Sequence, residues 1–119
     1  MPGEFPIPPI NEVNLDDVLA ALADRLRRAV VLELMNRAPG EYPCSSFTLP
    51  KAKSTRTHHW RVLRQAGLIR QRDAGNGSFV RLRDEFTEHF PGLLEVVKAG
   101  DRASALTKSP ASGTDADHS

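Results

Sequence analysis

A block of basic side chains is the feature of this sequence that is best suited to chemistry. Residues 43–83 contain nine Lys or Arg and one acid, Asp73, and nine less one is a net charge of +8. The rest of the chain holds seven basic and fourteen acidic residues, a net charge of −7. A basic block inside an otherwise acidic chain is typical of a surface that binds a polyanion. A solvated surface explains any one of these charges, but it explains nine with one counter-charge much less well.

Two neighbouring histidines, His58 and His59, are candidate metal ligands. Adjacent residues on a helix diverge by about 100°, so the two rings cannot easily hold one ion. We therefore expect His58 to face a nucleic acid and His59 to pack against or brace its own helix. His89 with Glu85 and Glu88 is a second possible metal group, which the ordinary polar surface of a helix explains more simply. We predict no metal site and no cofactor.

Cys44 is the only cysteine of the chain, which excludes an internal disulfide and fits a reducing compartment. One thiol without C-x-x-C spacing does not support a four-coordinate zinc site. A pair of Cys44 side chains in a dimer is an alternative that would sense oxidants. The chain has no Gly-rich phosphate loop, no nucleophile elbow and no carboxylate pair beside a histidine, so we do not predict an enzyme.

Length and composition predict one small domain. The chain has 119 residues, of which 39% are hydrophobic. Its aromatic residues are one Trp, one Tyr and five Phe, too few to indicate an aromatic-lined small-molecule site. The first residues carry neither a basic stretch nor an apolar run, and no 18 consecutive residues are apolar. We therefore expect a cytoplasmic protein that does not enter a membrane.

The first half of the chain predicts a Pro-rich arm followed by two helices. Residues 1–11 contain four Pro and form an extended arm, which is either disordered or packs Phe5 and Ile7 on the core. Apolar residues at three- and four-residue steps predict a helix from Leu15, with Asn14 as its N-cap. Asp24 is expected to cap a second helix over residues 25–36, with a buried stripe at Leu26, Val30, Val31 and Leu34.

The second half predicts a short helix, a basic helix and a hairpin. The short helix is expected near residues 45–49, and Ser54 is expected to cap a helix that stops at Gly67. Its Trp60 and Leu63 face inward, and Arg61, Arg64 and Gln65 face outward. The stretches LIRQR and SFVRLR then have the composition of strands, joined by a DAGNG turn. A last helical region spans residues 84–99 and is broken at Phe90-Pro91-Gly92, and the tail from Gly100 is expected to be disordered.

The order of these elements predicts a mainly α fold with a small two-stranded β-hairpin. A helix pair joined by a short turn and followed by a basic hairpin is the winged helix-turn-helix plan. The domain is expected over residues 12–99, between the arm (1–11) and the tail (100–119). Its basic helix is expected to enter the major groove of DNA, with Lys and Arg on its flanks against phosphates.

Three stretches of sequence resemble the ArsR-type (arsenic-repressor-like) winged-helix regulators. VLAALADRLRRAVVLEL resembles the family's ALADPxRRxIL signature, with Arg25 where Pro is usual. RLRDEFTEHFPGLLEVV looks like a subgroup whose last helix carries F-P-G-L-L. KSTRTHHWRVLRQAGLI resembles the recognition-helix motif S-x-S-x-H-L-x-x-L-x-x-A-G-L-V, with matches at Ser54, Thr57, His59, Leu63, Ala66, Gly67 and Leu68. The resemblance covers residues 15–99, and Trp60 replaces a Leu of the motif.

Two further positions depart from the family pattern. Arg56 stands where the family prefers an apolar residue, and Gly75-Asn76 at the tip of the hairpin replaces a common Gly-Arg pair. The usual metal-binding cysteines are also missing. The resemblance implies homodimers that bind imperfect palindromes in promoters, usually as repressors released by an effector, which here is unknown.

These considerations assign two sets of residues. The set expected to bind double-stranded DNA is Lys53, Ser54, Thr55, Arg56, Thr57, His58, Arg61, Arg64, Arg70, Arg72, Asn76, Ser78 and Arg81. The helical apolar residues are too many for a monomer of this size, and exposed apolar patches usually mark interfaces. The set expected to form the homodimer core and seam is Leu15, Val18, Leu19, Leu22, Leu93, Leu94 and Val97.

Two alternatives remain open. One is a sensor of the same fold that responds to a metal, an oxidant or a small organic molecule. The other is a winged-helix protein-interaction module that does not bind DNA, although the basic block argues against it.

Overall fold

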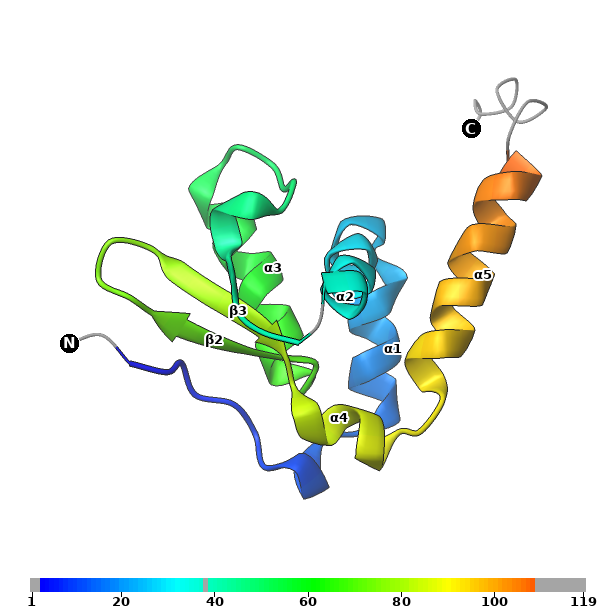
Figure 1. Ribbon diagram of the computed structural model, residues 1–119, viewed down its shortest axis with the longest axis horizontal. Coiled ribbons are helices and arrows are strands. Elements are labelled where there is room, and N and C mark those ends of the chain that lie inside the picture. Colours follow the sequence, from blue (N-terminus) through cyan, green and yellow to red (C-terminus); the bar gives the residue numbers. More distant parts are fainter. Residues whose placement is uncertain (1–2, 38, 109–119) are drawn as a thin grey trace.

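The computed structural model describes residues 3–37 and 39–108. The helices are α1 (Leu15–Ala23), α2 (Arg25–Arg37), α3 (Lys53–Gln65), α4 (Asp84–His89) and α5 (Leu93–Lys108). The strands are β1 (Tyr42–Pro43), β2 (Ile69–Asp73) and β3 (Ser78–Leu82), and single 3-10 turns lie at Ile10–Glu12 (η1) and Cys44–Ser46 (η2). Helix α3 packs against β2 and α1, α2 packs against α1 and β3, and α5 stands at the opposite end from the hairpin turn (Figure 1). Among the helices described, none has the length and apolar character needed to cross a membrane.

Side chains cap the first two helices as their sequences predict. The Asn14 side chain accepts a hydrogen bond from the Asp17 amide at 2.9 Å at the start of α1. Asp24 accepts one from the Arg27 amide at 3.0 Å at the start of α2. Each cap satisfies an amide that has no partner within its helix.

Helix α3 begins earlier than expected, and the prediction that Ser54 caps it is wrong. The N-cap is Ala52, which has no side-chain hydrogen bond to offer, and Ser54 lies exposed in the first turn. The Arg56 side chain instead donates to the carbonyls of Pro50 and Lys51, which holds the preceding segment against that turn. These contacts do not replace a cap, because a guanidinium donates hydrogen bonds and cannot accept them from the free amides of the first turn.

The sheet has three strands where the sequence predicted two. Its order is β1-β3-β2 and all pairs are antiparallel, with Tyr42 opposite Val80 and Arg70 opposite Arg81. The Tyr42 hydroxyl donates to the carbonyl of Arg37, which ties the two-residue strand β1 to the end of α2. The helix expected near residues 45–49 is reduced to the single turn η2, because the chain here is held in register with β3.

A glycine ends α3 by adopting a conformation that other residues avoid. Gly67 has φ of +83°, and the amides of Gly67 and Leu68 donate back to the carbonyls of Arg64 and Leu63 at 3.0 and 3.1 Å. This is the Schellman arrangement at a helix C-terminus. A Cβ at position 67 would lie 2.4 Å from a methyl carbon of Val13, so the close approach also requires glycine.

The N-terminal arm is ordered from Gly3 and runs along the free edge of β2. The Phe5 amide donates to the Gln71 carbonyl at 2.9 Å, and the Asp73 amide donates to the Gly3 carbonyl at 2.8 Å. The arm appears in Figure 1 as the blue segment that follows β2. An exposed strand edge is a template for unwanted pairing, and the arm covers it. The described part of the arm is thus held by backbone pairing with β2, whereas Phe5 and Ile7 are not among the apolar side chains packed against the core.

The core is formed within one chain and includes three residues of the set predicted to form the dimer core and seam. Trp60 and Leu63 face inward from α3 as expected, with 6% and 1% of their surface exposed. Val18, Leu22 and Leu94 belong to the predicted dimer set, and each is buried in this same core. Periodic apolar residues predict that a helix face is buried, and they do not say whether its own chain or a partner buries it.

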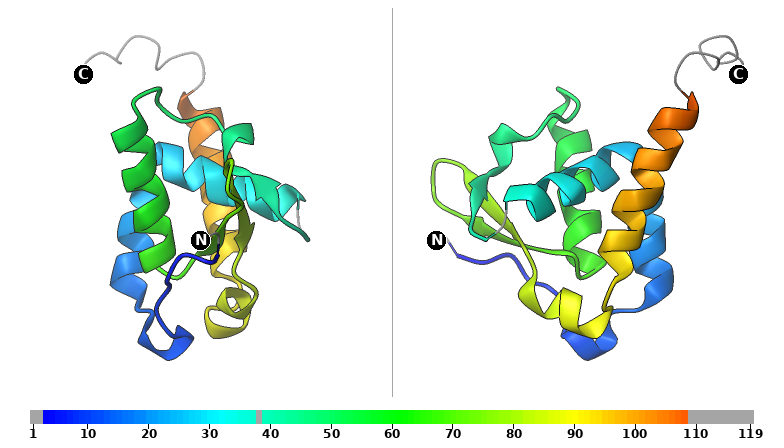
Figure 2. Two further views of the ribbon diagram at one scale, coloured as in Figure 1. Left: turned by 90° about the vertical axis from the view of Figure 1, so that its left-hand side faces the viewer. Right: turned by 45° about the vertical axis from the view of Figure 1, so that its right-hand side comes forward.

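Helix α5 is longer than predicted. The break at Phe90-Pro91-Gly92 is found, because α4 ends at His89 and α5 begins at Leu93. The helix then continues through Gly100 to Lys108, so the prediction of a disordered tail is wrong for residues 100–108. Arg28 of α2 forms an ion pair with Asp101 at 2.8 Å, which fixes this part of α5 beside α2 (Figure 2). The remainder of the predicted tail, residues 109–119, lies outside the described residues.

Candidate nucleic-acid interface

One face of α3 presents a row of exposed polar side chains. These are Lys53, Ser54, Thr55, Thr57, His58 and Arg61, six of the thirteen residues predicted to bind DNA. Ser54, His58 and Arg61 follow the steps of four and three residues that place side chains on one side of a helix. Helix α3 contains no acidic residue. The structure therefore brings these six side chains together on a surface of positive charge.

The opposite face of α3 is anchored through His59. This side chain is 7% exposed, and its Nδ1 lies 3.2 Å from Nη1 of Arg27. Because arginine only donates hydrogen bonds, Nδ1 of His59 must accept and the ring proton belongs on Nε2. Arg27 Nε also donates to the Ala21 carbonyl at 3.0 Å. Arg27 therefore links α1, α2 and α3, and the prediction that His59 braces its helix is confirmed.

Three exposed cations on or just before α3 have no acidic partner among residues 3–37 and 39–108, and they are Lys51, Lys53 and Arg61. Lys51 was not among the predicted site residues, although it lies within the basic block of residues 43–83. Arg56 is half-buried and uses its guanidinium on the backbone, as described above.

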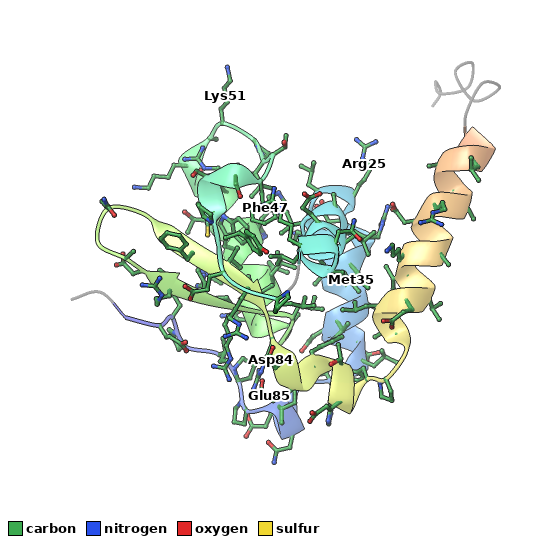
Figure 3. All side chains as sticks on the ribbon, in the orientation of Figure 1. Arg25, Met35, Phe47, Lys51, Asp84 and Glu85 are labelled. Atoms are coloured by element: carbon green, nitrogen blue, oxygen red, sulfur yellow. The ribbon has the colours of Figure 1, made fainter. Side chains whose placement is uncertain are left out.

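Two of the sheet arginines are neutralised by acids from outside the basic block. Arg72 donates to both carboxylate oxygens of Glu41, at 3.1 and 2.9 Å. This hydrogen bonding holds the pKa of the Glu41 carboxyl below its ordinary value and raises the pKa of Arg72. Arg81 pairs with Asp84 at 2.9 Å. Asp84 begins α4, directly below the sheet in the view of Figure 3.

Arg70 is paired twice. Its guanidinium contacts Glu4 of the N-terminal arm at 3.3 Å and Glu85 of α4 at 3.1 Å. Strand alternation and the register place Arg70 and Arg72 on the same face of the sheet as Arg81. The three sheet arginines of the predicted set are thus gathered on one face, but each already has an intramolecular counter-ion. The sequence count of +8 therefore overstates the free positive charge of the region.

Two other predicted residues turn inward. Arg64 donates to the Gln71 side chain and lies 4.6 Å above the ring of Phe5, and burial is the main cause that lowers its pKa. Ser78 donates to Cys44 Sγ at 3.2 Å and accepts from Gln71 Nε2 at 3.1 Å. Neither side chain belongs to the exposed face of α3.

Asn76 is the last of the predicted DNA-binding residues. It lies exposed in the β2–β3 turn between Gly75 and Gly77, and both of these glycines have positive φ. The turn is closed by a hydrogen bond of 2.8 Å from the Ala74 amide to the Gly77 carbonyl. The hairpin tip therefore carries one polar side chain and no charge.

Exposed apolar side chains remain on α1 and α5. Leu15 and Leu19 are 46% and 47% exposed, and Val96 is 68% exposed. Leu15 and Val96 line a shallow groove together with Phe90 and Leu93. Leu93 and Val97 are half-buried. Four of the seven residues predicted at the dimer seam, Leu15, Leu19, Leu93 and Val97, are therefore accessible on the single chain.

The candidate metal ligands do not meet. Within the described parts of the chain, no three His, Cys, Asp or Glu side chains are grouped closely enough to hold an ion. Cys44 is half-buried beneath the hairpin, where burial raises the pKa of its thiol. The His89 ring is in edge contact with that of Phe90, with 4.8 Å between the ring centroids.

Comparison with known proteins adds no relative. The chain matches no protein-family model, and no curated protein is significantly similar to it. A function has to be inferred from the exposed face of α3, the paired arginines of the sheet, and the apolar side of α1 and α5.

Proposed function

We propose that this protein is a sequence-specific DNA-binding transcriptional regulator of the winged helix-turn-helix type. It acts as a homodimer on a palindromic operator, as a repressor. The observation that carries the proposal is the exposed face of α3, which combines short polar side chains with free cations and contains no acid.

The dimensions of α3 support its entry into the major groove. A helix of 13 residues is about 20 Å long and about 10–12 Å wide, which matches the width of that groove. Arg61 can donate two hydrogen bonds to guanine, and His58 and Thr57 can contact other base edges. The His59–Arg27 contact and the Schellman end at Gly67 hold the helix rigidly, so these side chains meet DNA without reorganisation of the backbone.

Phosphate contacts are expected from fewer residues than the basic block contains. Lys51 and Lys53 are free, whereas a sheet arginine would have to leave its carboxylate before it could bind a phosphate. With Arg61 assigned to base edges, two free lysines per subunit give about four phosphate contacts in a dimer. Affinity should therefore depend on salt, with a slope of about −4 in log–log form.

The apolar side of α1 and α5 supports self-association. Leu15 and Leu19 stand one helical turn apart on α1, and Val96 lies across the shallow groove from Leu15. A two-fold dimer places identical surfaces against each other, so one apolar patch is sufficient to form it. The two α3 helices of such a dimer would reach half-sites about one turn of DNA apart.

Selection of bound sequences from a random duplex pool tests this proposal. We expect enrichment of an inverted repeat, and we expect His58→Ala and Arg61→Ala to relax base preference at defined positions of it. Thr87→Ala, an exposed position on α4, is the matched control and should leave the selected sequence unchanged. Failure to enrich any sequence would refute sequence-specific recognition, and sedimentation as a monomer at about 100 μM would refute the dimer.

The pairing of the sheet arginines favours a second candidate function. A protein-interaction module does not require free cations on the hairpin. Arginines that are neutralised by carboxylates are therefore consistent with such a module. Retention of random duplex DNA at 50 mM salt distinguishes the two, because a regulator with about four phosphate contacts binds non-specific DNA there and an interaction module does not.

A further inference from the structure

A groove opens beside α3, between its first turns, the η2 turn and the start of β3. Its volume is about 640 Å³, within the range typical of small-molecule sites. Phe47 and Lys51, both labelled in Figure 3, belong to its lining at this end of the molecule. Its lining comes from the N-terminal arm, the segment around η2, helix α3 and the two strands of the hairpin.

The charge of the groove selects an anion. Four cations line it, namely Lys51, Lys53, Arg56 and Arg64, and no Asp or Glu does. Elsewhere on the sheet every arginine of the predicted set is paired with a carboxylate, so the absence of acids from this lining is a local property. A negatively charged ligand would find cations here that have no competing counter-ion within the groove.

The walls of the groove are apolar and aromatic. Phe5, Phe47 and Trp60 are three of the chain's seven aromatic residues, and they come from the arm, the loop and α3. The rings of Phe47 and Trp60 meet edge to face, with centroids 5.9 Å apart. Composition alone predicted no aromatic-lined site, because it does not reveal that distant aromatic residues converge. Such walls suit a flat ring better than a hydrated inorganic ion.

The floor of the groove is polar and carries a positive charge. Gln71 is 6% exposed and its side chain is fully engaged with Arg64, Ser78 and Cys44. Arg64 has no acidic partner among residues 3–37 and 39–108. Its positive charge therefore attracts a carboxylate in the groove.

We propose that this groove binds a small aromatic carboxylate, whose ring lies among Phe5, Phe47 and Trp60 and whose carboxylate contacts Arg64 and the rim cations. Occupancy weakens DNA binding, because Lys53 and Thr57 belong both to the groove and to the exposed face of α3. The ligand site stands on its own observations. Its effect on DNA rests on the proposed function.

Titration with benzoate in the absence of DNA tests the site. Trp60 is the only tryptophan and lines the groove, so its fluorescence and its indole N–H resonance report binding directly. We expect a saturable response with a dissociation constant of about 1 mM or tighter, and benzamide, the uncharged isostere, should bind at least about tenfold more weakly. Inorganic phosphate is the third arm and should give no saturable change at Trp60.

Three outcomes overturn the site. The first is the absence of a saturable response to benzoate up to about 10 mM, and the second is an equal response to benzamide. The third is an equal response to phosphate, which would identify a general site for anions or for the DNA backbone.

Variants separate the groove from the rest of α3. Arg64→Gln should weaken benzoate binding about tenfold or more, since it removes a charge-assisted contact. Arg61→Gln is the matched control, because Arg61 lies on the same helix but outside the groove, and it should bind benzoate normally. Lys53→Gln, an exposed change at the rim, replaces Arg64→Gln if that variant does not fold. Equal binding by wild type and the folded groove variant would refute the assignment.

The effect on DNA is measured separately. Benzoate should release wild-type protein from its selected operator, and Arg64→Gln should need about tenfold more benzoate for the same release. Binding of benzoate without release refutes the regulatory half alone. If the protein selects no DNA, the proposed function fails, and the Trp60 titration still decides whether the groove is a ligand site.

Discussion

The Glu41–Arg72 pair offers a direct test of whether intramolecular carboxylates limit the proposed binding to DNA. Glu41 accepts both hydrogen bonds that Arg72 donates across the sheet, and both side chains are more than one-third exposed. Glu41→Gln removes the negative charge and releases the arginine to bind a phosphate. Because surface pairs of this kind contribute little to stability, the variant should fold like the wild type.

The expected gain in affinity for DNA follows from counterion release. One added phosphate contact per subunit steepens the log–log salt slope by about 0.9, or about 1.8 for a dimer, so the gain at 50 mM relative to 200 mM salt is about tenfold. Fluorescence anisotropy with a labelled duplex measures both the affinity and the slope. Glu88→Gln is the matched control, since it removes an exposed acid that has no ion pair within the described residues. It should leave the slope nearly unchanged.

Two results would refute this reasoning. One is an equal slope for Glu41→Gln and Glu88→Gln, which would mean that net charge alone matters. The other is a gain that persists in the double variant Glu41→Gln/Arg72→Ala, because the freed guanidinium would then not be its source. Arg72→Ala alone should change the wild-type slope little, since the arginine is already occupied.

Three further predictions concern folding and assembly. Gly67→Ala should lower the free energy of unfolding by about 2–4 kcal/mol, because the new methyl group would overpack against Val13 and the residue has a positive φ. In the same urea titration, Gly100→Ala within α5 should raise the free energy of unfolding by about 0.5–1 kcal/mol. The Arg27 amide holds the pKa of Asp24 below its ordinary value, so the stabilisation is present above the unfolded pKa and is lost as pH falls through the folded one. Asp24→Asn keeps a cap but cannot titrate, and its thermal midpoint should fall less between about pH 5 and pH 2 than that of wild type; equal losses would contradict this. Leu19→Glu places a charge on the apolar side of α1 and should convert the proposed dimer into a folded monomer, as measured by sedimentation. A dimer that persists in this variant would mean that the interface lies elsewhere.

Features set by neighbouring residues were predictable from the sequence. Asn14 and Asp24 cap helices through hydrogen bonds that span three residues, and Pro91-Gly92 interrupts a helix wherever it occurs. The inward direction of Trp60 follows from helical periodicity in the same way. Each of these depends on a few consecutive side chains, so the local pattern contains the necessary information.

Features that join distant segments were not predictable. The strand β1 exists because Tyr42 meets Val80, and the arm is ordered because Phe5 meets Gln71. Neither segment has a strand-like pattern of its own. A charge count along the sequence likewise cannot reveal that Glu41 lies beside Arg72, because a pair separated by this much chain forms only once the sheet has formed.

The placement of charge has a consequence for how the proposed regulator would find its site. Electrostatic attraction draws a protein to any DNA, whereas contacts at base edges distinguish one sequence from another. Pairing of the sheet arginines leaves the first contribution to a few free lysines, whereas Arg61, His58 and Thr57 of α3 would supply the second. The groove shares Lys53 and Thr57 with the exposed face of α3. A ligand bound there would therefore reduce a large part of the remaining affinity for DNA. A protein with few phosphate contacts has less free energy of binding to DNA than a protein with many. A weakly bound ligand can therefore release it from DNA more easily.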